Sequence, residues 1–131
     1  MLRGVTTNAP DDDEAAALED TRAAVQSLLD GLAEEGSDLT KPLDVEFLVF
    51  APSEAIARVV AVRTTAMGLT TEVAPDDDPE AAADGAWLCT CRATLVPELE
   101  RIVALERLVD RLAQELGGFV DGFGSSGNAP E

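Results

Sequence analysis

Apolar residues recur with two different periods along the chain, and the two periods separate helices from strands. Apolar residues three or four positions apart, the spacing of one helix face, mark residues 14–35, 53–67 and 97–116. Alternation at every second position, the spacing of a strand, marks residues 44–50, 69–74 and 86–93. The pattern therefore predicts three helices and three strands up to residue 116.

The residues that bound these segments are typical of helix ends. Ser53 suits the N-cap position, and Pro97 suits the first turn of the last helix. Gly36 and Gly68 follow the first two helices, where glycine readily takes the left-handed conformation that ends a helix. The boundaries predicted from periodicity and from these residues agree.

A glycine-rich segment at residues 117–124 predicts a fourth strand. Its four glycines exclude a helix. Phe119 and Val120 favour a short strand. Asp121 and Gly122 predict a turn after it, because glycine tolerates a positive backbone angle.

The order helix, strand, helix, strand, strand, helix, strand predicts an α+β fold. Apart from the N-terminal helix, it is the βαββαβ arrangement of a ferredoxin-like antiparallel sheet with both crossover helices on one face. A chain of 131 residues has room for one domain. We expect a single ferredoxin-like domain over residues 14–124, with disordered tails over residues 1–13 and 125–131, which lack apolar periodicity.

The second face of the predicted sheet is also partly apolar. Leu48, Phe50 and Leu88 alternate with the core positions of their strands and would point to that face. We expect the first helix to cover them. The alternative is that a partner or a second copy of the chain docks there.

Acidic residues outnumber basic ones along the whole chain. Twenty-six Asp and Glu against nine Lys and Arg give a formal charge of −17. This surface repels a phosphate backbone, so we expect no direct contact with nucleic acid. A basic protein segment is the natural partner, because the same field speeds its approach. The alternative is that the charge only keeps a small protein in solution.

The residue types favour a binding protein over an enzyme. The chain has no histidine, which removes the usual general base and the usual metal ligand. Residues 76–84 resemble part of a calcium loop, but Ala81 stands where that loop needs glycine and Trp87 where it needs a bidentate glutamate. We therefore expect no catalytic residues, no metal and no cofactor.

Cys89 and Cys91 are the two cysteines of the chain. Side chains two positions apart on a strand point the same way, and a disulfide between them would be strained. We expect buried reduced thiols, which pack as small apolar groups. A redox pair is the alternative.

The hydropathy of the chain also predicts the cellular compartment of the protein. Residues 1–13 lack the apolar run of a signal peptide, and no later run approaches the length of a membrane span. We expect a cytoplasmic protein with no membrane contact. No feature of the sequence indicates an oligomeric state.

Three short motifs stand in a compatible order across residues 14–124. They are Asp-Thr-Arg at residues 20–22, Glu-Glu-Gly-Ser-Asp at residues 34–38 and Asp-Gly-Phe-Gly at residues 121–124. Together they resemble the regulator of ribonuclease E activity B family, small acidic inhibitors of ribonuclease E. That family commonly ends in Tyr-Asp-Gly-Trp-Gly, whereas Val120 and Phe123 stand at its aromatic positions here.

The resemblance implies a non-enzymatic protein that binds ribonuclease E. The implied contact is the non-catalytic C-terminal scaffold of the enzyme, which is rich in basic segments, and the implied effect is to restrain RNA processing and decay. The alternative is a ferredoxin-like domain that senses a small molecule or dimerises. Its candidate ligand donors are Arg58, Arg63 and Arg92.

Four residues form the candidate partner-binding site: Arg22, Asp121, Gly122 and Phe123. The resemblance points to the last three. Arg22 interrupts the apolar face of the first helix, and its guanidinium is expected to bind a carboxylate, with Asp121 and Glu46 as candidates. Phe123 is either a core residue or an exposed anchor for a partner.

Overall fold

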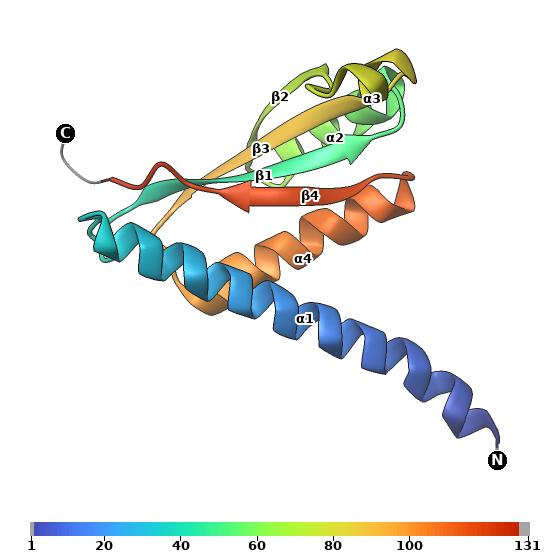
Figure 1. The fold of residues 1–131 in the computed structure, drawn as a ribbon, viewed down its shortest axis with the longest axis horizontal. Coiled ribbons are helices and arrows are strands. Elements are labelled where there is room, and N and C mark those ends of the chain that lie inside the picture. The colour runs from blue at the N-terminus through green and yellow to red at the C-terminus, as the bar shows by residue number, and fades with distance from the viewer. Residues whose placement is uncertain (1, 129–131) are drawn as a thin grey trace.

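The computed structural model of the protein describes residues 2–128. Four helices and four strands follow one another in these residues (Figure 1). They are α1 (Leu2–Glu34), β1 (Leu43–Ala51), α2 (Glu54–Ala66), β2 (Thr70–Pro75), α3 (Pro79–Ala83), β3 (Trp87–Leu95), α4 (Leu99–Glu115) and β4 (Phe119–Gly124). Every predicted helix and strand is present, and α3 is additional. Across this part of the chain, no helix has the continuous apolar length that a membrane span requires.

The four strands form one antiparallel sheet in the order β2-β3-β1-β4. β1 pairs with β3 along its whole length, from Leu43 opposite Leu95 to Ala51 opposite Trp87. β2 and β4 form the two edges. Since α2 and α4 pack on the same face, the predicted ferredoxin-like α+β fold is confirmed.

The hydrophobic core lies between the sheet and these two helices. β1 contributes Val45, Phe47 and Val49, which are fully buried. Val60 of α2 and Ile102 of α4 belong to the same core. Burial of a side chain of this size stabilises a fold by about 1.5–3 kcal/mol. This layer therefore supplies much of the driving force for folding.

α1 packs beside α4 and extends the helical layer. Val25, Leu29 and Leu32 of α1 are buried in the common core, and α1 meets α4 near the start of α4, from where the two helices diverge (Figure 1). The expectation that the first helix covers the second face of the sheet is therefore wrong, and Leu48 remains 38% exposed. The physical reason is that the apolar face of α4 is wide enough to contact the sheet and α1 together.

Both ends of the domain differ from the predicted boundaries. α1 begins at Leu2, where the sequence predicted a tail over residues 1–13 and a helix from residue 14. Residues 125–128, also predicted as tail, contact the loop between α1 and β1. The side-chain amide of Asn128 donates to the carbonyl oxygens of Asp38 and Pro42 at 2.9 and 3.2 Å. Residues 1 and 129–131 lie outside the described residues.

Candidate functional site

Asp121 and Gly122 lie within a strand, so the predicted turn is wrong. Gly122 pairs with Leu48 of β1, and the register shifts by one residue between Leu48 and Val49. Asp121 is the extra residue of this β-bulge. Pairing with β1 satisfies backbone hydrogen bonds that a turn would leave to solvent. The φ angle at Gly122 is not positive, so the glycine is not required by the backbone.

Phe123 lies on the face of the sheet that the helices cover. It is opposite Phe47, and the two ring centroids are 6.3 Å apart. The Phe123 ring is partly buried and packs against the hydrophobic core. This position corresponds to the core alternative for Phe123.

Arg22 forms an ion pair with Glu100 in the first turn of α4. Neither of its expected partners, Asp121 or Glu46, pairs with it. The side chains of Arg22 and Glu100 are 39% and 65% exposed, so the pair contributes little to stability. Arg22 therefore connects α1 to α4, whereas residues 121–123 connect β4 to β1. The structure does not bring Arg22 and residues 121–123 together into one site.

The face of the sheet opposite α2 and α4 carries an apolar row at one end. The row crosses all four strands, since Ala74 pairs with Leu88, Leu88 with Phe50, and Phe50 with Phe119. The rings of Phe50 and Phe119 stack with their centroids 5.0 Å apart. Leu48 lies two residues before Phe50 in β1, on the same side of the sheet. We call this side of the sheet the open face and these five residues its apolar row.

Carboxylates gather at the other end of the open face. Arg92 Nε donates to Glu46 Oε2 at 3.0 Å, across the β1–β3 pair. This hydrogen bond raises the pKa of Arg92, and the charges of Glu46, Glu72 and Asp44 raise it further. We call these four residues the acidic cluster. With three carboxylates around one guanidinium, it is net negative.

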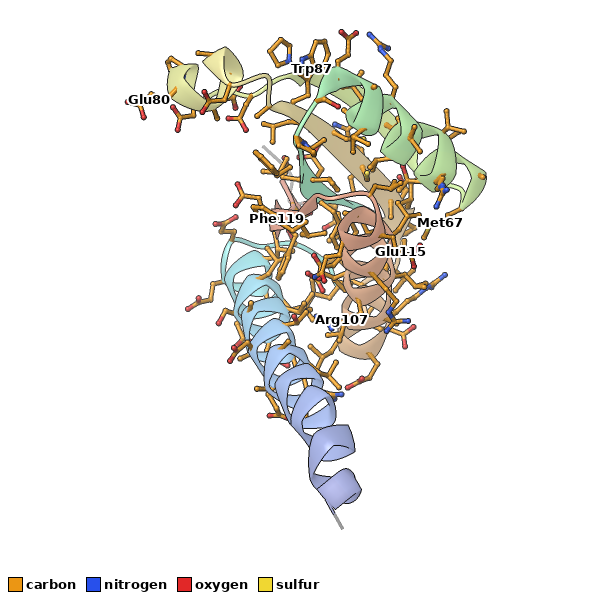
Figure 2. The ribbon with its side chains drawn as sticks, turned by 90° about the vertical axis from the view of Figure 1, so that its right-hand side faces the viewer. Met67, Glu80, Trp87, Arg107, Glu115 and Phe119 are labelled. Carbon is orange, nitrogen blue, oxygen red and sulfur yellow. The ribbon has the colours of Figure 1, made fainter. Side chains whose placement is uncertain are left out.

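Two glycines of β4 leave part of the open face without side chains. A Cβ added at Gly122 or Gly124 would meet no atom within 4 Å. The space beside β1 is therefore free on this side. In Figure 2, Phe119 lies on one side of α4 and Met67, at the end of α2, lies on the other.

The arginines considered for a small-molecule site do not converge. Arg58 and Arg63 belong to α2, where Arg58 Nη2 donates to Glu54 at 2.7 Å and the guanidinium lies 5.8 Å from the centre of the Trp87 ring. Arg92 lies on the open face, across the sheet from α2. The three side chains therefore do not line one cleft.

Cys89 and Cys91 are fully buried on the covered face of β3, as free thiols. Their Sγ atoms are 3.8 Å apart, and Cys91 Sγ donates to Thr64 Oγ1 at 3.6 Å. The hydrogen bond with Cys91, together with burial, raises the pKa of the Cys89 thiol. These are the buried reduced thiols that the sequence predicts.

Glu106 is a buried acid that the sequence pattern did not single out. It is 7% exposed and lies on the buried face of α4. Its Oε1 has no hydrogen-bond partner in the described part of the chain. Burial raises the pKa of this carboxyl and Asp110 raises it further, while Arg107 opposes the shift. Its place three residues after Val103 and three before Val109, within the apolar stripe, was the available signal.

The fold and the open face define a small acidic α+β protein whose candidate site is a surface suited to a protein partner. The chain belongs to the family described as regulator of ribonuclease activity B, which matches residues 22–125. The match includes all four strands and confirms the resemblance to this family. No curated protein matches the chain.

Proposed function

We propose that the protein is a non-enzymatic regulator that binds the non-catalytic C-terminal scaffold of ribonuclease E in the cytoplasm and restrains RNA processing and decay. The observation that carries this proposal is the family match over residues 22–125, because the family is described as a regulator of ribonuclease activity. The choice of the scaffold as target rests on the resemblance of the motifs at residues 20–22, 34–38 and 121–124.

The charge of the chain supports a basic protein target. A formal charge of −17 attracts a basic scaffold segment and speeds its encounter with the protein. The same charge repels RNA, so the regulator acts on the enzyme and leaves the substrate free. Salt screens this attraction over about 8–10 Å at ordinary ionic strength.

The side chains support binding over catalysis. The sequence has no histidine, and the carboxyl of Glu106, whose pKa is raised, is buried on the inner face of α4. A general acid must reach its substrate to transfer a proton. Glu106 therefore has a structural role in this proposal.

An RNA-cleavage assay with two forms of ribonuclease E tests this function. One form is the full-length enzyme, and the other is its catalytic domain without the scaffold. We expect the protein to slow cleavage by the full-length enzyme and to leave the catalytic domain unaffected. Poly-glutamate at the same concentration of charge is the control for non-specific acidity.

Two results would contradict the proposal. Equal inhibition of both enzyme forms would place the target in the catalytic domain. Unchanged cleavage by both forms would remove ribonuclease E as the target.

A further inference from the structure

We propose that the open face is the surface that binds the partner, and that it recognises a basic amphipathic segment. This inference rests on the proposed function, which supplies the partner. It adds which side of the domain makes the contact and what chemistry the bound segment needs.

The apolar row provides the anchoring part of this surface. Leu48 is 38% exposed and Phe119 is 43% exposed, although both are large apolar residues. Adjacent strands lie about 4.8 Å apart, so a row across four strands spans about 15 Å, the length of about ten helical residues. An exposed apolar surface that is continuous in this way is typical of an interaction site.

The acidic cluster selects the charge of the bound segment. Glu46, Glu72 and Asp44 surround the guanidinium of Arg92 on the same side of the sheet as the apolar row. Asp121 is exposed at the bulge of the neighbouring edge strand. A segment with apolar side chains on the row and arginine or lysine beyond it satisfies both ends of the open face.

The glycines of β4 give that segment room. Gly122 lies opposite Leu48, and Gly124 lies opposite Glu46, on the open face. Neither needs to be glycine for its backbone angle, and a Cβ at either would project into empty space. A docked segment can therefore approach β1 closely at these two positions.

A second copy of the chain fits this surface less well than a basic partner. Full overlap of two open faces would either bring their acidic clusters together or bury each cluster against the apolar row of the other copy. The first arrangement sets like charges opposite each other, and the second desolvates charges without partners. Charge complementarity therefore favours a basic segment from another protein.

The outer side of the helices also carries exposed apolar residues, but without a cluster of carboxylates among the described residues of its groove. A groove of about 400 Å³ between α2 and α4 is lined by Met67, Leu105, Leu108 and Arg101, among others. Arg63 lies in the last turn of α2 on this layer. A basic segment would meet Arg101 and no carboxylate among the described lining residues here, so this groove fits the proposed partner less well than the open face does. It does provide a matched control, since Leu108 is 51% exposed.

The test compares Leu48→Lys with Leu108→Lys in the full chain. Both variants replace an exposed leucine and change the net charge by the same amount, so the comparison is matched in side chain and charge and alters two different surfaces. The probe is the purified C-terminal scaffold of ribonuclease E, titrated by calorimetry. We expect Leu48→Lys to weaken binding by about 30-fold, the size of an interface hot spot, and Leu108→Lys by less than about 3-fold.

A second variant guards against a folding defect in the first. Gly122→Lys adds a cation to the open face without removing any packed atom. If Leu48→Lys melts well below the parent, Gly122→Lys replaces it, with the same expected loss of binding. Unchanged affinity in the folded open-face variant, or an equal loss in Leu108→Lys, would overturn the assignment of the surface.

A peptide arm separates this inference from the proposed function. The probe is a synthetic peptide of about 20 residues with leucines at helical spacing and arginines elsewhere. If the scaffold does not bind but the peptide does, with the same sensitivity to Leu48→Lys, the target is wrong and the open face stands. If neither probe binds the parent protein, both proposals fail.

Discussion

Phe123 of β4 packs opposite Phe47 of β1 on the covered face of the sheet, with 6.3 Å between their ring centroids. Phe119, four residues earlier on the same strand, stacks on Phe50 on the open face. The bulge at Asp121 separates the two aromatic residues. β4 therefore presents one phenylalanine to the core and one to solvent.

This arrangement predicts different effects for two alanine substitutions on one strand. Phe123→Ala removes a ring packed on the core and should lower the free energy of unfolding by about 3 kcal/mol. Phe119→Ala removes a ring that is 43% exposed and should cost less than about 1.5 kcal/mol. Urea unfolding of both variants measures the difference. A larger loss from Phe119→Ala would contradict the assigned orientation of β4.

Glu106 predicts a specific dependence of stability on pH. Burial holds the pKa of its carboxyl above the ordinary value of 4.5, so the folded state keeps the proton to a higher pH than the unfolded state does. The contribution of Glu106 to stability therefore falls as the pH rises from about 4.5 through the raised pKa. Glu106→Gln removes this loss and should stabilise the protein at neutral pH by about 1 kcal/mol.

The measurement is urea unfolding of the parent and of Glu106→Gln at several pH values between about 4.5 and 8. The advantage of the variant should grow with pH. Glu115→Gln, at an exposed position of the same helix, removes the same charge and should show no such growth. Parallel pH profiles for the two variants would show that burial of Glu106 has no influence on stability.

The Arg22–Glu100 ion pair is expected to contribute little to the stability of the fold. Because both side chains are well exposed, a double-mutant cycle with Arg22→Ala and Glu100→Ala should give a coupling free energy below about 1 kcal/mol. The single variants should also leave scaffold binding unchanged, since neither residue lies on the open face. A loss of binding in Arg22→Ala without loss of stability would assign Arg22 to the interface.

The two ends of the chain should respond differently to change. Removal of residues 1–13 should leave the melting temperature of the protein unchanged, because this segment lacks the apolar periodicity needed for packing. Asn128→Ala breaks hydrogen bonds to Asp38 and Pro42 and should cost about 1 kcal/mol. Thermal unfolding of both variants measures the two effects. A large loss on removing residues 1–13 would show that α1 needs its N-terminal third.

Periodicity predicted β1, β3 and α4 well because each of them buries one face. α4 illustrates this, since Ile102, Val103, Val109 and Ala113 are all buried on one face. The same logic gave the ferredoxin-like order of elements. It also predicted that Cys89 and Cys91 lie on the same side of β3.

The remaining features depend on tertiary contacts that a local pattern does not contain. Asp121-Gly122 has the composition of a turn, but pairing with β1 made it a bulge. α1 has the stripe of a core helix, which does not specify whether it packs on the sheet or on α4. α3 formed in an acidic segment because Asp78 caps its first turn, with Pro79 beginning the helix.

The most direct test of the central claim is a calorimetric titration of the full chain with the purified C-terminal scaffold of ribonuclease E at rising salt concentration. We predict saturable binding that weakens steeply as salt increases, because a chain of charge −17 meets a basic segment. The isolated catalytic domain should not bind under the same conditions. Absence of heat with the scaffold, or binding to the catalytic domain alone, would contradict the claim that this protein regulates ribonuclease E through its scaffold.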